Sequence, residues 1–223
     1  MAEYIVKIKA IDHLNHDVLK IVTERPQGYD FTPGQATDVS INKEGWKKEK
    51  SPFTFTCLPG AGYLEFNIKT YPQREGVTNE LRKLGEGDEL ILHDVFGKIN
   101  YKDEGVFIAG GAGVTPFISI LRDLDSRNEI GDNKLIFANK TKEDIFLKDE
   151  FKDMLGDNFI NILSEEETEE YAHGFVNEDF LRKHIDPNVK NVYICGPPAM
   201  LDLLEDILFK LDIDKESIVK EEF

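Results

Sequence analysis

The sequence of 223 residues contains only two cysteines, Cys57 and Cys195, which lie far apart and form no Cys-x-x-Cys pair. Iron–sulfur clusters and cysteine-type zinc sites need several closely spaced thiolates, so we expect neither of them within this chain. The five histidines also lack the His-x-x-x-His and His-Glu-x-x-His spacings that are typical of metal sites. We therefore predict that the protein has no metal site.

Long apolar runs are absent too, since no stretch reaches the ~18 residues that a membrane-spanning helix requires. The first residues alternate apolar and polar side chains, unlike the continuous apolar core of a signal peptide. Basic residues are the scarcer charged type, and the net charge is −16. Because phosphate binding needs clustered Lys and Arg, a nucleic-acid partner is not expected. We predict a soluble, cytoplasmic protein that binds neither membranes nor nucleic acid.

The first half of the chain carries short segments that alternate apolar and polar residues or are rich in β-branched and aromatic ones, as strands are. Turns with Pro and Gly separate them, and a short helical stretch, Thr78–Leu84, lies between the last two. Since a closed sheet leaves no exposed edge, this series predicts an antiparallel β-barrel over residues 1–101. The expected strands are Tyr4–Ala10, Val18–Thr23, Thr37–Ile41, Phe53–Cys57, Tyr63–Thr70 and Glu89–Asp94.

From residue 102 onward, strand-like runs alternate with helical patterns. This alternation predicts right-handed crossovers and a doubly wound parallel sheet, an α/β nucleotide-binding domain over residues 102–223. The expected strands are Val106–Ala109, Lys134–Ala138, Phe159–Leu163, Asn191–Cys195 and Ser217–Lys220. The expected helices are Thr115–Leu124, Lys148–Leu155, Asn177–Lys183 and Ala199–Leu211.

Two glycine turns follow apolar strands of this second half. The first is Gly110-Gly111-Ala112-Gly113-Val114-Thr115-Pro116, in which Thr115 is suited to cap a helix that opens with Pro116. The second is Cys195-Gly196-Pro197. Tight turns use glycine for steric reasons alone, but a glycine turn between a strand and a helix also lets the backbone approach a pyrophosphate. We predict a nucleotide site at the carboxyl edge of the sheet, where both turns lie.

Five short motifs follow one another along the chain: Pro33-Gly34-Gln35, Ser51-Pro52-Phe53-Thr54, Gly76-Val77-Thr78, Gly110–Pro116 and Cys195-Gly196-Pro197. Each is similar to a motif of the ferredoxin–NADP reductase family, in that family's order, so the whole chain resembles this family. The resemblance implies a flavoprotein that moves a hydride from NADPH or NADH to bound FAD, with FMN the less favoured flavin. It also implies that electrons pass onward to a protein acceptor such as flavodoxin or ferredoxin.

The resemblance implies catalytic roles for Thr54, beside flavin N5, and for Cys195, beside nicotinamide C4. Hydride transfer between two stacked rings requires no protein acid or base. It further implies that the terminal aromatic residue, Phe223, covers the flavin, with a frayed tail or a core anchor as the alternative. The implied cofactor-binding residues are Pro52, Phe53, Thr54, Lys69, Tyr71, Gly76, Val77, Thr78, Gly110, Gly111, Gly113, Thr115, Pro116, Asn139, Lys140, Cys195, Gly196, Pro197 and Phe223.

One position departs from the family pattern. Ser51 stands where the family has an arginine that pairs with the flavin phosphate, so a charge-assisted contact is missing. Lys48, Lys50 or Arg74 could replace it. Two other functions stay open: a flavin- and nucleotide-binding regulatory subunit without turnover of its own, and an NAD(P)H:flavin reductase that uses flavin as a substrate. The missing arginine favours the second of them.

Two lysine groups bear on the choice of ligand and partner. Lys140 and Lys142 offer charge to a 2′-phosphate and favour NADPH, whereas Asn139 could equally bind a ribose hydroxyl of NADH. A basic segment next to Trp46, Lys47-Lys48-Glu49-Lys50, stands out in this acidic chain. It is either a solvated loop or a docking face for an acidic electron acceptor.

Overall fold

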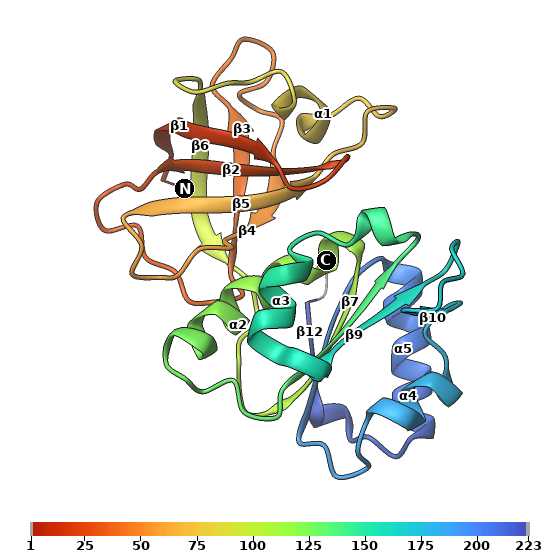
Figure 1. Ribbon diagram of the computed structural model, residues 1–223. Helices are drawn as coiled ribbons and strands as arrows, with labels where there is room; N and C mark the ends of the chain where they lie inside the picture. The colour runs from red at the N-terminus through yellow and green to blue at the C-terminus, as the bar shows by residue number, and fades with distance from the viewer. Residues whose placement is uncertain (1, 222–223) are drawn as a thin grey trace.

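The computed structural model describes residues 2–221 and has two lobes (Figure 1). The first lobe is a sheet of six antiparallel strands in the order β4-β3-β6-β1-β2-β5. Its elements are β1 (Tyr4–His13), β2 (Val18–Glu24), β3 (Ala36–Ile41), β4 (Ser51–Thr54), β5 (Tyr63–Lys69), α1 (Val77–Leu81) and β6 (Glu89–Phe96). The predicted antiparallel barrel is confirmed.

The barrel closes where the chain leaves β4. The backbone N–H of Phe55 donates to the carbonyl of Gln35, next to β3, but the N–H of Thr56 donates to the carbonyl of Glu65 in β5, at 2.9 Å. This change of partner ends β4 at Thr54, although the apolar pattern predicts a strand to Cys57. The side chains of Phe55 and of alternate β5 residues fill the barrel core, where they are removed from water.

The second lobe is a parallel sheet of six strands in the order β10-β9-β8-β7-β11-β12. Its strands are β7 (Gly105–Gly110), β8 (Lys134–Asn139), β9 (Phe159–Leu163), β10 (Ala172–His173), β11 (Asn191–Cys195) and β12 (Ile218–Lys220). Its helices are α2 (Thr115–Ser126), α3 (Lys148–Leu155), α4 (Glu178–His184) and α5 (Pro198–Lys210). The predicted doubly wound sheet is confirmed.

Alternate residues of each central strand face opposite layers of helices. Phe107 of β7 and Tyr193 of β11 stack at 4.3 Å between ring centroids, in a core shared with α2 and α3. Their neighbours Val106 and Val192 belong to the core on the other face, shared with α4 and α5. Figure 1 shows these helix pairs on the two faces of the sheet, with α2 and α3 on the side nearer the barrel.

The chain order places a switch point beside β7. From β7 it runs outward through β8, β9 and β10, and then returns to β11 on the other side of β7. In open sheets of this type, ligands bind at the carboxyl ends of the strands at such a point. The predicted domain boundary, between residues 101 and 102, falls in the connection from β6 to β7 and stays a prediction. No helix within residues 2–221 is long and apolar enough to cross a bilayer.

Candidate active site

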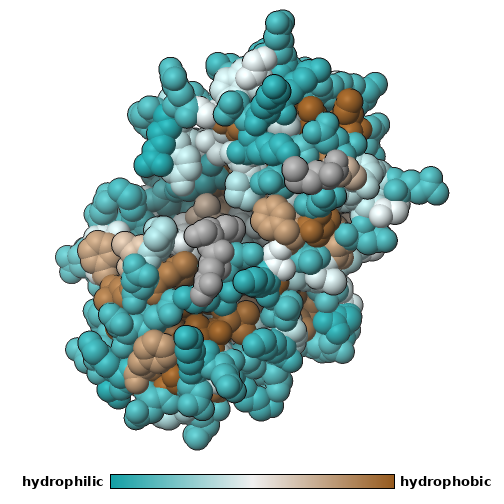
Figure 2. Space-filling view, turned by 180° about the vertical axis from the view of Figure 1, so that it is seen from behind, coloured by the Kyte–Doolittle hydropathy of each residue, from teal (hydrophilic) through white to brown (hydrophobic). Residues whose placement is uncertain are grey.

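A cleft of about 970 Å³ lies between the barrel and the carboxyl edge of the parallel sheet. This volume is at the upper end of the range of about 300–1,000 Å³ that is usual for small-molecule sites. Figure 2 shows hydrophobic surface running from the waist between the lobes into the lower lobe. The predicted residues that line the cleft are Pro52, Phe53, Thr54, Lys69, Tyr71, Thr78, Gly110, Gly111, Gly113, Thr115, Pro116, Asn139, Lys140, Cys195, Gly196 and Pro197.

Three predicted site residues are not placed in this lining. Of the residues that the structure describes, Gly76 and Val77 lie outside it, and the Val77 side chain is buried in the barrel core. Thr78 is thus the member of the predicted phosphate turn that reaches the cleft. Phe223 lies outside the described residues.

The barrel wall of the cleft is built by the outward row of β5. Leu64, Phe66 and Ile68 fill the barrel core, so the residues between them, Glu65, Asn67 and Lys69, point outward. The two ends of this row bind the second lobe. Glu65 accepts a hydrogen bond from Arg122 of α2 at 2.6 Å, and Lys69 donates to Asp144, which follows β8, at 3.3 Å.

Arg122 makes the larger of these two connections. Its guanidinium also donates to the Thr56 carbonyl at 2.7 Å and to both carboxylate oxygens of Glu150 in α3. Burial opposes the charge on this guanidinium, but Glu150 and Glu65 outweigh burial and raise its pKa. Arg122 therefore stays charged and holds α2 and α3 against the barrel.

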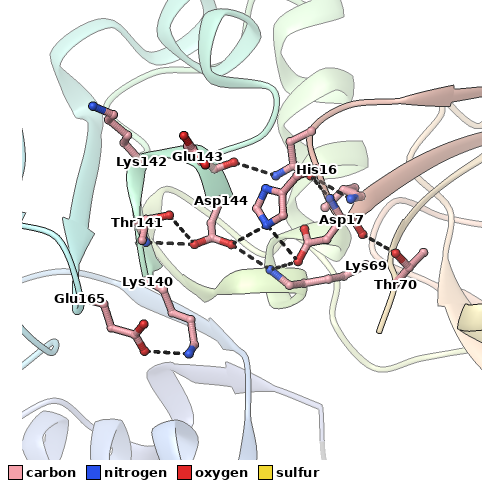
Figure 3. A network of polar contacts seen from close by, with 12 residues as sticks. His16, Asp17, Lys69, Thr70, Lys140, Thr141, Lys142, Glu143, Asp144 and Glu165 are labelled. Atoms are coloured by element: carbon pink, nitrogen blue, oxygen red, sulfur yellow. Dashed lines mark hydrogen bonds and ion pairs between the residues drawn. The ribbon is translucent and has the colours of Figure 1, made fainter. Parts of the chain in front are cut away.

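Lys69 lies between two carboxylates, one from each lobe (Figure 3). Its Nζ is 2.9 Å from Asp17 Oδ2 and 3.3 Å from Asp144 Oδ1. Burial lowers the pKa of Lys69, but the hydrogen bond and charge of Asp17, with those of Asp144, raise it overall. Burial likewise opposes ionisation of Asp144, yet hydrogen bonds from Thr141 and the charge of Lys69 lower its pKa. The Lys69 ammonium thus forms ion pairs within and between the lobes. The predicted flavin contact would use this same ammonium.

The residues around the Lys69 ammonium include a possible set of metal ligands. Within the described part of the chain, His16, Asp17 and Asp144 place one ligand atom each within 4.8 Å of the others. The Lys69 ammonium already contacts both of these carboxylates and supplies the positive charge that they need. We therefore treat the group as an ion-pair network between the lobes.

The part of the sheet wall that follows β7 is a glycine-rich turn. A 3₁₀ turn, Gly111–Val114, leads directly into α2, and the Thr115 hydroxyl donates back to the Ala112 carbonyl at 3.0 Å. Thr115 is already helical, so its predicted role as the capping residue is wrong: the 3₁₀ turn continues into the helix and leaves no extended residue there.

Glycine is required where the two predicted turns meet. A Cβ at Gly113 would lie 2.3 Å from the Cys195 carbonyl oxygen, and a Cβ at Gly110 would lie 2.4 Å from Met200 Sδ. The turn after β7 and the turn after β11 are therefore in direct backbone contact, which brings Gly110, Gly113 and Cys195 to one edge as predicted.

Cys195 ends β11 on this wall and is buried to 8% exposure. Burial raises the pKa of its thiol to about 12, with a contribution from the Glu221 carboxylate. At neutral pH the group is a neutral thiol, so it is unsuited to nucleophilic attack, which requires the thiolate. What it offers a bound ring is a small, polarisable and uncharged surface.

The end of the cleft beyond β8 and β9 carries charge and an aromatic ring. Lys140 and Glu165 both line it, and their charged groups are 2.7 Å apart (Figure 3). Lys142 is paired in the same way with Glu166, at 3.4 Å. Phe175, in the loop after β10, lines this end with 75% of its surface exposed. Both glutamates belong to the acidic run Glu165-Glu166-Glu167-Thr168-Glu169-Glu170.

The possible substitutes for the missing family arginine lie in different places. The Lys50 ammonium points at His93 Nδ1, at 3.3 Å, and Lys48 is exposed. Arg74 stacks over the ring of Tyr71, with 5.0 Å from its Cζ to the ring centroid, and Tyr71 lines the cleft. Among Lys48, Lys50 and Arg74, Arg74 is thus the possible substitute that contacts a residue of the cleft lining.

The basic segment, residues 47–50, belongs to the loop that joins β3 to β4. Ala36 at the start of β3 and Thr54 at the end of β4 line the cleft. The loop therefore joins the opposite ends of these strands, and a docking role for it stays a prediction.

The cleft fits the two expected ligands. Asn67 and Asn139 are buried in its lining. Both amide atoms of Asn67 and the amide nitrogen of Asn139 have no hydrogen-bond partner among residues 2–221. Since buried polar groups are normally paired, such atoms indicate a polar ligand. An antiparallel barrel and a doubly wound sheet that share such a cleft are the architecture expected of a two-domain, nucleotide-dependent oxidoreductase.

Comparisons with known proteins give the same class. Residues 107–206 match the model of the oxidoreductase NAD-binding domain. The reductase component of propane 2-monooxygenase from Rhodococcus jostii is 28% identical over 97% of this chain and 62% of its own length. NADH-cytochrome b5 reductase 2 from Mycosarcoma maydis is 29% identical over 88% of this chain and 62% of its own length.

The fold has a match along its whole length. A ferredoxin NADP⁺ reductase from Neisseria gonorrhoeae, whose crystal structure contains FAD and NADP, covers 99% of this chain with a TM-score of 0.82 and 19% identity, and 98% of that chain is matched. Residues 107–206 are thus an oxidoreductase NAD-binding domain, and the whole chain is similar to the ferredoxin reductase-like oxidoreductases that bind FAD and NAD(P). The resemblance stated from the sequence is confirmed, and the flavin and nicotinamide cofactors that it implies are those bound by similar proteins. The chain spans about three fifths of the length of the two curated relatives named above.

Proposed function

We propose that this chain transfers a hydride from NADH to a bound FAD and passes the electrons on to a protein acceptor. One observation carries the proposal. Thr54 and Cys195, which the family resemblance assigns to flavin N5 and nicotinamide C4, line the same cleft from opposite walls. Two rings stacked between these walls would be held in a reactive arrangement, which is the main requirement of hydride transfer.

The chain's own residues orient the rings and exclude water. The barrel wall offers the hydroxyl of Thr54 and the ring of Phe53, and the sheet wall offers backbone and the neutral thiol of Cys195. The flavin supplies the redox chemistry, taking up a hydride and giving up electrons. Because the Cys195 pKa is about 12, a pH dependence of the transfer between pH 6 and 9 is not expected from this residue.

The choice of NADH over NADPH rests on the pairing of the lysines. Lys140 and Lys142 are each paired with a glutamate, so neither of these lysines offers an unpaired charge to a 2′-phosphate within the described part of the chain. A carboxylate near the ribose, such as Glu165, accepts hydrogen bonds from the 2′-hydroxyl of NADH and repels a phosphate. This pairing removes the basis on which the sequence favours NADPH.

The coenzyme choice is tested with Glu165→Gln, which releases Lys140. We expect kcat/KM for NADPH to rise about tenfold, equivalent to about 1.4 kcal/mol, while that for NADH falls. Glu170→Gln is the matched control, because Glu170 forms a similar exposed pair with Lys148 in the same loop region. Equal values for NADH and NADPH in the wild-type protein would contradict the proposal before any substitution is made.

The acceptor is proposed from the relatives. Their names describe a monooxygenase reductase component and a cytochrome b5 reductase, both of which deliver electrons to proteins. Ferredoxin or flavodoxin are acceptors of the same kind. Stopped-flow oxidation of the reduced protein by each acceptor type identifies the one that reacts fastest.

A second function is favoured by Ser51. Without the arginine of the flavin motif, flavin could be exchanged during turnover, as in an NAD(P)H:flavin reductase. A yellow purified protein that bleaches with NADH under anaerobic conditions supports the bound-flavin reductase. Colourless protein with flavin-dependent NADH oxidation supports the flavin-reductase function. Yellow protein that NADH and NADPH fail to bleach supports a regulatory subunit.

A further inference from the structure

Asn67 carries a feature that the family motifs do not explain. Its side chain is buried to 5% exposure and lines the cleft, yet neither its amide oxygen nor its amide nitrogen finds a hydrogen-bond partner within the described chain. A buried amide left unpaired on both atoms costs free energy, because water is lost and nothing replaces it. A ligand that pairs with both atoms would remove that cost.

The barrel seam places Asn67 beside the flavin motif. The Thr56 N–H donates to the Glu65 carbonyl at 2.9 Å, and the Thr56 hydroxyl donates to the Glu65 carboxylate at 2.9 Å. These two residues are therefore neighbours across the seam, with side chains on the same outer face. Since neighbouring strands here run antiparallel, two residues further along each strand bring Thr54 opposite Asn67 on that face.

The surroundings of Asn67 leave it available to a ligand. Its neighbours in the outward row of β5 are both engaged with the second lobe, Glu65 with Arg122 and Lys69 with Asp144. These two connections fix the barrel against the sheet on either side of Asn67. The amide lies between them and faces the cleft.

We propose that Asn67 binds the pyrimidine edge of the flavin ring, its amide nitrogen donating to O4 and its amide oxygen accepting from N3–H. A primary amide offers one donor and one acceptor side by side, and an imide edge offers the complementary pair. O4 lies beside N5, the atom assigned to Thr54, and N3 is bonded to the same C4 carbonyl carbon as O4. The residues on either side of the seam would therefore bind neighbouring positions of one flavin ring system. The proposal rests on the flavin function proposed above and assigns a positioning role to a residue outside the family motifs.

The nicotinamide carboxamide offers the same chemistry, and the location decides between the two ligands. Asn67 lies on the barrel wall with Pro52, Phe53 and Thr54, whereas the nucleotide turns form the sheet wall. The flavin ring is therefore the occupant that we assign to Asn67.

The test compares Asn67→Leu with the wild-type protein after removal of flavin. Leucine has nearly the same size but leaves no unpaired polar atoms, so the flavin-free variant should unfold at a higher temperature than the wild type. Its Kd for FAD, measured by fluorescence titration, should rise about tenfold, as expected for the loss of two ordinary hydrogen bonds. Asn67→Asp cannot donate to O4, and it should make the flavin midpoint potential more negative.

Asn161→Leu is the matched control. Asn161 is a strand residue of similar burial whose amide oxygen also lacks a partner within residues 2–221, but it lies outside the cleft lining. Its substitution should leave the FAD Kd and the flavin spectrum unchanged.

The outcomes separate the two proposals. Wild-type protein that binds neither FAD nor FMN overturns the proposed function, and this inference with it. Wild-type protein that binds FAD, together with an Asn67→Leu variant of unchanged FAD Kd and spectrum, overturns the inference alone. If Asn67→Leu changes only the Kd for NAD⁺, Asn67 contacts the nicotinamide, and the inference is again overturned. If Asn67→Leu fails to fold, the potential and FAD Kd of Asn67→Asp decide in the same way.

Discussion

The two walls of the cleft are built from different parts of the polypeptide. The barrel wall presents side chains, such as those of Thr54, Asn67 and Lys69, whereas the sheet wall presents backbone where the turns after β7 and β11 meet, at Gly110 and Gly113. The difference follows from the folds. Strands run along the barrel wall, so alternate side chains project from it, but the parallel strands end at the sheet wall and turn into helices there.

This difference predicts how each wall responds to substitution. On the barrel wall a change of side chain alters one contact and leaves the strand in place, since the neighbouring strands hold it. On the sheet wall an added Cβ must displace a turn, because the turns after β7 and β11 touch through their backbones. Ligand contacts should therefore be adjustable on the barrel wall and highly sensitive to substitution on the sheet wall.

Gly113→Ala should have the largest effect. Its Cβ would meet the Cys195 carbonyl oxygen at 2.3 Å and push the two turns apart. We expect a loss of about 3 kcal/mol in the free energy of unfolding, as for overpacked sites. The displaced turns should also lower kcat/KM for NADH about 100-fold. Denaturant unfolding and steady-state kinetics measure the two effects.

Gly111→Ala is the control for that substitution. Gly111 lines the same wall with a φ of +52°, but no heavy atom of the described residues lies within 4 Å of its added Cβ. Its cost should be limited to backbone strain, about 1 kcal/mol. Equal losses for the two variants would show that the contact between the turns is not what makes the wall sensitive.

Arg122→Ala tests how the two walls are held together and should have the next largest effect. Glu65 is buried to 4% exposure and would lose its closest charged partner. We expect a loss of about 3 kcal/mol in the free energy of unfolding, because a buried carboxylate is left without its guanidinium. Thermal unfolding measures it. Arg127→Ala on the same helix removes a half-exposed arginine and should cost less than about 0.5 kcal/mol.

Much of the fold follows from local patterns. The sequence predicts Phe159–Leu163, Asn191–Cys195 and Lys148–Leu155 with the bounds that the structure has, because each is an apolar or amphipathic run with clear ends. The strand Ala172–His173 is missed, since two exposed residues carry no periodic pattern. The early end of β4 is missed for another reason, because it depends on a partner strand chosen only when the barrel closes.

The site is predictable as far as its motifs reach. The two glycine turns meet in the cleft because they end the neighbouring strands β7 and β11. Asn67 is one polar residue in an alternating strand, and only tertiary structure reveals that its amide is unpaired. Glu165 belongs to an acidic run, and its pairing with Lys140 requires β8 and β9 to be neighbours. Long-range pairing of this kind leaves no local signal.

Asp144→Asn tests the smaller connection between the walls and should have the smallest effect. The charge of Asp144 stabilises the closed lobes through Lys69, which keeps Asp17 as a second partner, so we expect a loss of only about 1 kcal/mol near pH 7. Asp157→Asn is the control, since Asp157 also has a lowered pKa but forms its ion pair on the surface.

The pH dependence of unfolding shows whether this connection acts as an ion pair. The pKa of Asp144 is lowered from its ordinary 3.8, so its contribution is complete above that pH and is lost as the pH falls through the lower folded value. The pKa of Lys69 is raised from 10.5, so its contribution is complete below that pH and is lost as the pH rises through the higher folded value. The wild-type protein should therefore keep the connection between about pH 4 and pH 10 and lose it on either side. If Asp144→Asn lowers stability equally at pH 7 and pH 2.5, Asp144 acts through its shape and hydrogen bonds and does not act as an ion pair.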